Sequence, residues 1–233
     1  MKLVVLQPSY LPWLGYLDQY HWADAFVLYD DVQYDKNGWR NRNRILTAQG
    51  VQWLTVPVRL KGQDFPPIRQ VPINNQDRWP KKHVETLRQA YSRSRYFEMV
   101  FPPIERVLAR PWELLVDLDV AMLKALVELL GMPWKGVLAS ELEVPGRQTD
   151  RLVGICRQLG ATEYLTGDAA RDYLDEQAFS EAGVRVHWHG YEHPCYRQRN
   201  EEFVPYLSVV DLLFHHGPES LEILARSRAP ACG

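Results

Sequence analysis

Acidic and arginine side chains are concentrated in one short segment of the chain, residues 30–44. Asp30 and Asp31 are adjacent carboxylates, a pair that can bind a metal ion or accept a proton from a nucleophile. Arg40, Arg42 and Arg44 alternate with other residues, so an extended backbone would place their guanidinium groups on one face. Such a face suits phosphate or carboxylate. The segment therefore predicts an anion-binding surface next to a proton acceptor.

Two other interpretations of this segment compete with the first. A charged edge strand that keeps neighbouring chains away has the same composition. A single-stranded RNA site would need aromatic residues among the basic ones, and only Trp39 lies within the stripe. The whole chain has 27 lysine and arginine residues against 29 acidic residues, which gives no general attraction to nucleic acid. Nucleic acid is therefore not an expected partner.

A second candidate segment, residues 7–16, is rich in proline and aromatic residues and lies between a predicted strand and a predicted helix. In doubly wound sheets this position faces the ligand crevice at the carboxyl ends of the strands. Neither G-x-G-x-x-G nor G-x-x-x-x-G-K-[ST] occurs there, so no cofactor is identified. Tyr10 and Trp13 are either ligand contacts or core residues that fasten the loop.

Two C-terminal segments carry further candidates. His187, His189 and His193 are close enough in sequence for a zinc site, but no second ligand cluster accompanies them, and a polar edge strand with a turn is the favoured interpretation. Ser208 and Asp211 have the spacing of an N-cap and a first-turn acid. The alternative makes Asp211 a buried carboxylate that faces the site.

The elements that would position these groups alternate between strand and helix. Apolar, β-branched runs predict strands at 3–6, 25–29, 136–139, 163–166 and 184–189. Helical spacing of apolar residues predicts helices at 14–23, 78–91, 102–108, 111–130 and 149–159, and 207–215 is either a short helix or a strand-to-helix segment. We also expect a hairpin from strands at 44–47 and 51–58, followed by a surface loop at 59–77.

This order of elements predicts an α/β protein with a Rossmann-like, mostly parallel sheet and a largely helical insertion at about 78–132. We expect one α/β domain over residues 1–226, with 78–132 as a helical subdomain and 227–233 as a frayed tail. The first apolar run, residues 3–6, is too short for a signal peptide or a membrane span. Three widely spaced cysteines suit a reducing compartment. We therefore expect a cytoplasmic protein without membrane insertion; no pattern indicates its oligomeric state.

Long stretches of the sequence resemble the WbqC-like family of bacterial proteins, and they cover nearly the whole chain. The matching stretches are Gln7 to Tyr16, Asp30 to Tyr34, Lys36 to Arg44, Tyr164 to Gly167 with Tyr173 and Leu174, His193 to Gln198, and Phe203 with Leu207 to Phe214. Members of that family occur among genes for polysaccharide and O-antigen biosynthesis, and one suggested role is the transfer of glycine to a sugar. The histidines at 187, 189, 215 and 216 do not match the family pattern, which weakens the zinc hypothesis.

The resemblance implies a set of functional residues that joins the segments described above. Its members are Gln7, Tyr10, Trp13, Asp30, Asp31, Lys36, Trp39, Asn41, Arg42, Tyr196, Gln198 and Asp211. We predict Asp30, Asp31 or Asp211 as the proton acceptor. Arg42 and Arg44 are predicted to hold phosphate or carboxylate, and Trp13 and Trp39 to pack a sugar or base.

The function predicted from these features is transfer of glycine or another small acyl or aminoacyl group to a nucleotide-activated amino sugar. The small-molecule partner would then be a nucleotide-sugar. The alternative is a non-catalytic binding module for a polysaccharide precursor or a partner enzyme, which needs the same aromatic and arginine surface but no proton acceptor. A metal-dependent hydrolase built on the three histidines is a third hypothesis. The transferase hypothesis requires the segments near residues 10, 40 and 210 to meet around a single cleft at one rim of the sheet.

Overall fold

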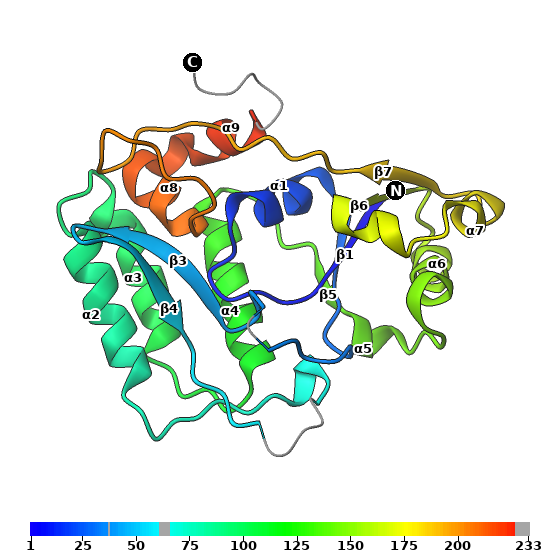
Figure 1. The fold of residues 1–233 in the computed structure, drawn as a ribbon, viewed down its shortest axis with the longest axis horizontal. Coiled ribbons are helices and arrows are strands. Elements are labelled where there is room, and N and C mark those ends of the chain that lie inside the picture. The colour runs from blue at the N-terminus through cyan, green and yellow to red at the C-terminus, as the bar shows by residue number, and fades with distance from the viewer. Residues whose placement is uncertain (37, 61–65, 227–233) are drawn as a thin grey trace.

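A parallel sheet forms the centre of the molecule in the computed structural model, which describes residues 1–36, 38–60 and 66–226 (Figure 1). Its five strands lie in the order β5-β2-β1-β6-β7, and every neighbouring pair is parallel. The strands are β1 (Lys2–Leu6), β2 (Ala25–Leu28), β5 (Gly136–Leu138), β6 (Glu163–Thr166) and β7 (Arg185–Trp188). The predicted α/β, Rossmann-like fold is confirmed.

The strand sequences explain why the sheet is covered on both faces. Successive side chains of a strand point to opposite faces, and Leu3 and Val5 pack in one apolar cluster while Val4 packs in another. Parallel sheets of this kind are continuous in apolar residues because both faces are buried. Helix α6 (Gln148–Leu159) contributes to the smaller cluster and α1 (Leu14–Trp22) to the larger one.

The strand order places a change of direction at the carboxyl end of β1. The chain passes from β1 to β2 on one side, and β6 pairs with β1 on the other. This is the position at which open α/β sheets form a ligand crevice. The loop 7–13 and the segment 29–31 leave the sheet from this edge.

Three helices form the predicted insertion between β4 and β5 (Figure 1). They are α2 (Trp79–Tyr91), α3 (Phe97–Leu108) and α4 (Leu115–Leu129). Helix α3 begins five residues before its predicted start, because Pro102 and Pro103 lie inside the helix rather than at its first turn. Helix α4 begins later than predicted, because main-chain bonds from Ile73 to Glu113 and from Leu115 to Val71 keep Leu114 extended.

The hairpin is a separate two-stranded antiparallel sheet of β3 (Arg42–Thr47) and β4 (Gly50–Thr55). β4 is shorter than predicted at its C-terminal end. The segment 59–77, predicted as a surface loop, is partly buried: Ile68, Val71 and Ile73 are core residues, and Ile68–Gln70 forms a 3-10 turn. Residues 61–65 of that predicted loop lie outside the described part of the chain.

The C-terminal third packs smaller elements around the sheet and the hairpin. They are α5 (Ala139–Leu142), η2 (Asp168–Asp172), α7 (Glu176–Glu181), α8 (Val209–His216), η3 (Gly217–Glu219) and α9 (Ser220–Ala225). The predicted tail 227–233 lies outside the described residues. Within the described ranges, no helix combines the length and apolar character needed to cross a membrane.

Candidate functional site

The segments near residues 10, 40 and 210 meet beside the hairpin. The Tyr10 amide donates to the Arg40 carbonyl at 3.0 Å, and the Ser208 amide donates to the Arg44 carbonyl at 2.8 Å. The Val209 amide closes the junction by donating to Pro12 at 2.9 Å. The three segments are therefore in direct main-chain contact, although Trp13, Arg42 and Arg44 do not line the cleft described below.

Asp211 is the centre of a buried polar network at this junction. Its side chain is 0% exposed, and its two carboxylate oxygens accept from the Tyr91 hydroxyl at 2.8 Å and the Tyr196 hydroxyl at 3.0 Å. Helix α8 begins with Ser208 as its N-cap, whose hydroxyl oxygen accepts from the Val210 amide. Ser208 thus caps the helix, and Asp211 is a buried carboxylate in its first turn.

Burial controls the ionisation of this network. It raises the pKa of Asp211 to about 6, although the bonds from Tyr91, Tyr196 and Gln198 act in the opposite direction. Burial and the nearby Asp211 charge raise the pKa of both tyrosines well above the ordinary value. The phenols therefore remain donors, and Asp211 is the member of the network that titrates near neutral pH.

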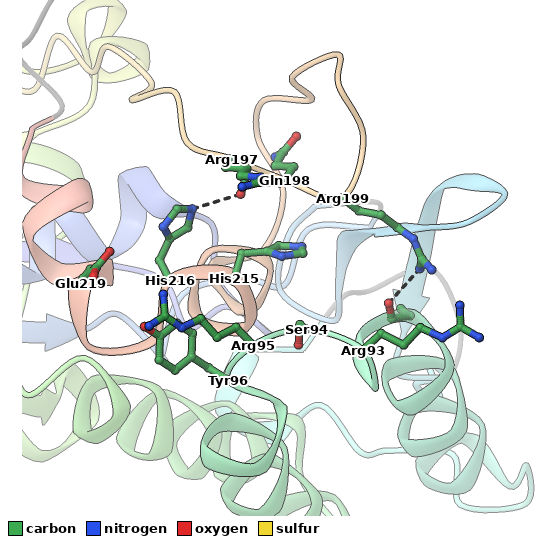
Figure 2. Close-up of a pocket in the computed structure, with 11 residues that line it drawn as sticks. Arg93, Ser94, Arg95, Tyr96, Arg197, Gln198, Arg199, His215, His216 and Glu219 are labelled. Carbon is green, nitrogen blue, oxygen red and sulfur yellow. Dashed lines mark hydrogen bonds between the residues drawn. The ribbon is translucent and has the colours of Figure 1, made fainter.

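A cleft of about 510 Å³ opens next to the network (Figure 2). The 93–96 turn between α2 and α3 lies on one side of it in Figure 2, the 197–199 segment lies on the other, and the histidines of α8 lie between them. The lining residues are Ala90, Arg93, Ser94, Arg95, Tyr96, Arg197, Gln198, Arg199, His215, His216 and Glu219.

The cleft is strongly cationic because four arginines line it. Across the described ranges, Arg93, Arg95, Arg197 and Arg199 form no ion pair, and Glu219 is the one acidic lining residue. A bond from Arg199 to the Ala90 carbonyl at 2.9 Å orients one guanidinium without cancelling its charge. Guanidinium groups bind phosphate and carboxylate, so the cleft is suited to an anionic ligand.

His215 connects the cleft to the buried network. Its Nε2 lies 3.9 Å from the Asp211 carboxylate, too far for a hydrogen bond. Burial and the positive charges of His216, Arg199 and Arg197 lower the pKa of His215 to about 4. The imidazole is therefore neutral at neutral pH. Its position four residues after Asp211 on one helix was the sequence signal that could have identified it.

Backbone geometry keeps the cleft open at Gly217. This glycine has a φ of +50°, and a Cβ placed there would lie 2.4 Å from Cδ1 of Tyr96. Tyr96 lines the cleft, so the absence of a side chain at 217 lets the ring take this place. On the opposite wall, Gln198 ties the chain into a loop by donating to the Val204 carbonyl at 2.9 Å and accepting from the Val204 amide at 2.8 Å.

The two predicted carboxylates at 30 and 31 lie elsewhere, at the carboxyl end of β2. Asp30 is 1% exposed and accepts from the Ser140 amide at 2.9 Å and the Ser140 hydroxyl at 2.7 Å. Asp31 forms an ion pair with Arg151 of α6. The adjacent carboxylates therefore bind two different helices.

Three predicted ligand contacts sit in or beside the 7–16 loop. Gln7 is partly buried, and Tyr10 is 0% exposed with its hydroxyl 2.9 Å from His83 Nδ1. Trp13 lies over Gly15 and packs against Tyr191, with ring centroids 4.9 Å apart. Tyr10 is thus a core residue, whereas Trp13 reaches the partly exposed surface.

A buried carboxyl that the sequence pattern did not single out lies near this loop. Asp119 of α4 is 1% exposed, and neither of its oxygens has a hydrogen-bond partner among the described residues. Burial raises its pKa well above the ordinary value, and the Arg40 charge opposes that shift. An acid in an apolar helix resembles a surface residue in sequence, which is why the pattern did not reveal it.

The predicted arginine face is present in part on the hairpin: Arg42 and Arg44 belong to it, whereas Arg40 lies before β3 and pairs with Asp35 at 3.5 Å. Arg42 and Arg44 lie on one side of β3 with their guanidinium carbons 4.6 Å and 5.8 Å from the Trp53 ring centroid, and Asn43 is buried. Trp39 is 37% exposed and lies 5.4 Å from Trp53 between ring centroids.

None of these residues lines the 510 Å³ cleft. Asn41 is buried and holds β3 to Val56 through its main-chain and side-chain atoms, while Lys36 is exposed. The predicted ligand contacts of the 36–44 segment are therefore divided between the hairpin surface and its interior.

The three histidines of the zinc hypothesis point to different partners. His187 Nε2 lies 2.9 Å from Glu163, and His189 Nε2 lies 2.6 Å from Asp18. His193 Nδ1 bonds to the Pro194 carbonyl at 2.9 Å. No group of three or more potential metal ligands occurs within residues 1–36, 38–60 and 66–226.

Comparison with known proteins gives two matches that cover nearly the whole chain. The model of the WbqC-like protein family matches residues 7–223. The uncharacterized protein Rv1507c of Mycobacterium tuberculosis (strain ATCC 25618 / H37Rv) is 38% identical over 229 residues, which covers 97% of this chain and 99% of that protein. No solved structure matches the chain.

Proposed function

The chain belongs to the WbqC-like protein family, and from that premise we propose that it is a group-transfer enzyme. Its substrate is a nucleotide-activated amino sugar, bound by its phosphates in the cationic cleft. The group transferred is glycine or another small acyl or aminoacyl group. The observation that carries the proposal is the cluster of four arginines next to a neutral histidine.

The ligand class follows from the charge and size of the cleft. Guanidinium groups bind phosphate and carboxylate in a bidentate manner, and arginines lie on both walls of the cleft, where they could contact a diphosphate. A volume of about 510 Å³ lies in the range of pockets that hold small molecules. These features support a nucleotide-sugar over a neutral sugar.

The transfer step requires a base for the attacking amine. The amine nitrogen bonds to the acyl carbon, the bond from that carbon to its activating group breaks, and the leaving group departs with the electron pair. His215 is neutral and lines the cleft, so it takes the proton that the amine loses. Asp211 is fully buried and is proposed as a positioning residue, because it lies four residues before His215 on α8 with its carboxylate 3.9 Å from Nε2.

The other predicted residues keep proposed roles outside this cleft. Asp30 and Asp31 stay candidate proton acceptors at the carboxyl edge of the sheet, where the β1 loop also emerges. Trp13, Trp39, Arg42 and Arg44 stay candidate contacts for the sugar or its anionic groups. A second substrate bound at that edge would be needed for these roles.

A non-catalytic binding module is the second candidate function. It is favoured by one observation: each predicted carboxylate already has a partner, Ser140 for Asp30, Arg151 for Asp31 and two tyrosines for Asp211. Such a module would use the same cationic cleft to recognise a polysaccharide precursor or a partner enzyme.

Ligand binding is tested by calorimetry with UDP, UDP-glucosamine and free glucosamine. We expect the two UDP compounds to bind and glucosamine not to bind. Arg197→Gln should weaken UDP binding by about tenfold or more, since a hydrogen bond to a charged group contributes about 1.5 to 3 kcal/mol. Arg106→Gln, an exposed arginine of α3, is the matched control. Equal binding by wild type and Arg197→Gln would contradict the cleft as the phosphate site.

Turnover separates the enzyme from the binding module. The protein is incubated with UDP-glucosamine and a panel of glycine and acyl donors, free and activated, and the amino sugar is examined by mass spectrometry for added mass. We expect His215→Gln to bind UDP normally and to lose product formation. Binding without product from any donor in the wild type would favour the non-catalytic module.

A further inference from the structure

The two edges of the hairpin are not equivalent. The residues of an antiparallel pair alternate between pairs that exchange hydrogen bonds and pairs whose main-chain groups point outward. Thr47 and Gly50 flank a two-residue turn and form a hydrogen-bonded pair. The pairs Leu46 with Val51 and Arg44 with Trp53 are therefore the outward-pointing ones.

The rest of the molecule covers the outer edge of β3. The Leu46 amide donates to the hydroxyl of Tyr91, the last residue of α2, at 3.3 Å. The Arg44 carbonyl accepts from the Ser208 amide at 2.8 Å. Both bonds occur at the residues that the alternation identifies as outward-pointing, which supports the assignment.

The outer edge of β4 is open over Val51 to Trp53. β4 pairs with β3 alone among the described strands, and Val51 and Trp53 are 45% and 43% exposed. No hydrogen bond from outside the hairpin reaches the main chain of either residue in the described ranges. The edge ends at Thr55, whose main chain bonds to His83. An open edge of this kind can accept one more strand.

Positive charge and aromatic surface flank this open edge. The guanidinium carbon of Arg42 lies 4.6 Å from the Trp53 ring centroid, so the side chain extends from β3 across β4. Arg44 lies 5.8 Å from the rings of both Trp39 and Trp53. Its guanidinium donates to the Pro205 and Tyr206 carbonyls, which leaves its charge uncancelled by those bonds. Tryptophan and arginine are also the residues that contribute most binding energy at protein interfaces.

We propose that the open edge of β4 is a docking site for an extended acidic segment of a partner protein, which adds as a third strand. The main chain of the segment bonds to Val51 and Trp53, and its acidic side chains lie toward Arg42 and Arg44. A second copy of this chain is a less suitable occupant, because pairing of β4 with β4 of the other copy would bring two arginine faces of like charge together. The proposal does not depend on the transfer reaction.

The experiment measures binding of a labelled ten-residue peptide that alternates glutamate with valine to the full chain, by fluorescence anisotropy. The comparison peptides carry lysine in place of glutamate, or N-methyl groups on the valines that block strand pairing. We expect the glutamate peptide to bind at least tenfold more tightly than either. Equal binding by the N-methylated peptide would overturn the proposal, as would failure of the glutamate peptide to bind.

Val51→Pro is the decisive variant. It removes an outward N–H without breaking the β3–β4 ladder, and it follows Gly50, which tolerates the restriction that proline imposes on its predecessor. We expect at least tenfold weaker peptide binding with an unchanged circular dichroism spectrum. Trp134→Ala removes a tryptophan of similar exposure, 38%, far from the hairpin in sequence, and should leave binding unchanged.

Two further outcomes would identify a different occupant of the β4 edge and so refute the acidic segment. A wild-type dimer in sedimentation equilibrium that Val51→Pro converts to a monomer would assign the edge to a second copy of the chain. Binding of a ten-nucleotide thymidine strand that is tighter than peptide binding and is unaffected by Val51→Pro would assign the arginine face to a polynucleotide. If Val51→Pro fails to fold, Arg42→Gln takes its place. This variant should weaken binding of the glutamate peptide more than binding of the lysine peptide.

Discussion

At the scale of single residues, Asp211 has the most consequential environment in the molecule. It is fully buried, holds two phenol donors and lies near a histidine that lines the cleft. A buried carboxyl satisfied by two donors costs less to ionise than an isolated one. The residue therefore combines a structural role at the start of α8 with a charge that the cleft can use.

Titration of Asp211 should be visible in the pH dependence of stability. Burial raises its pKa in the folded chain from 3.8 to about 6, so the folded chain binds this proton more tightly. The resulting stabilisation is complete below about pH 4 and is lost as the pH rises through about 6, an effect of about 3 kcal/mol. Urea unfolding measures the free energy of unfolding of the wild type and of Asp211→Asn between pH 4 and pH 7. Over this range the wild type should lose about 3 kcal/mol of stability relative to Asp211→Asn. The exposed control Asp150→Asn should show no such difference from wild type.

Gly217 should be far less tolerant of alanine than other glycines with a positive φ. A methyl group there meets the Tyr96 ring, whereas Gly131, with a φ of +71°, has nothing within 4 Å of an added Cβ. We expect Gly131→Ala to cost about 1 kcal/mol for its backbone alone and Gly217→Ala to cost about 2 to 4 kcal/mol. Urea unfolding of both variants measures the difference, and equal costs would show that Tyr96 moves aside freely.

At the scale of elements, the adjacent carboxylates of residues 30–31 fasten two helices to the end of β2. Asp30 accepts from the first turn of α5, and Asp31 pairs with α6. Asp30→Ala should therefore destabilise the fold by about 1 to 3 kcal/mol, because it leaves the Ser140 amide without its acceptor. Asp172→Ala, at an exposed position of η2, is the control in the same urea experiment.

A double variant of Asp30 and Asp31 tests their predicted catalytic role. Asp30→Asn with Asp31→Asn keeps the size of both side chains and removes their charge. If either accepts the proton from the nucleophile, the double variant should bind UDP-glucosamine and form no product. Normal turnover by a folded double variant would leave these residues with their structural contacts alone.

Elements with a repeating apolar pattern were predictable from the sequence. The buried strands, the arginine face of the hairpin and the start of α8 at Ser208 all followed from periodicity or capping. Helix α3 did not, because Pro102 is a typical first-turn residue and here lies in the interior of a longer helix. The extended segment before α4 did not follow either, because bonds to residues 71 and 73 decide it.

The cleft itself was not predictable for a physical reason. Its arginines lie in two irregular segments, near 95 and near 198, that carry no periodic signal. Only packing of the helical insertion against α8 brings them together, as the stacking of Tyr91 on Phe214 at 4.3 Å between ring centroids shows. Asp211 was identified, whereas His215 was missed because it lay outside the family pattern.

At the scale of the whole molecule, charge is distributed unevenly. The chain has a formal net charge of −2, yet four arginines gather in one cleft. Long-range attraction of an anion is therefore weak, and binding depends on the local field, which salt screens over about 10 Å at 0.1 M. Calorimetry of UDP at 0.05 M and 0.5 M NaCl should show at least fivefold weaker binding at the higher concentration. Salt-independent binding would indicate that uncharged contacts dominate.

The walls of the cleft are made at very different times during synthesis. The turn carrying Arg93 and Arg95 leaves the ribosome about a hundred residues before the segment carrying Arg197 and Arg199, and α8 follows later still. A nascent chain can fold its insertion early and yet have no place for an anion. The cleft is complete only after the last quarter of the polypeptide has docked, so an anion cannot be held from both walls before that point.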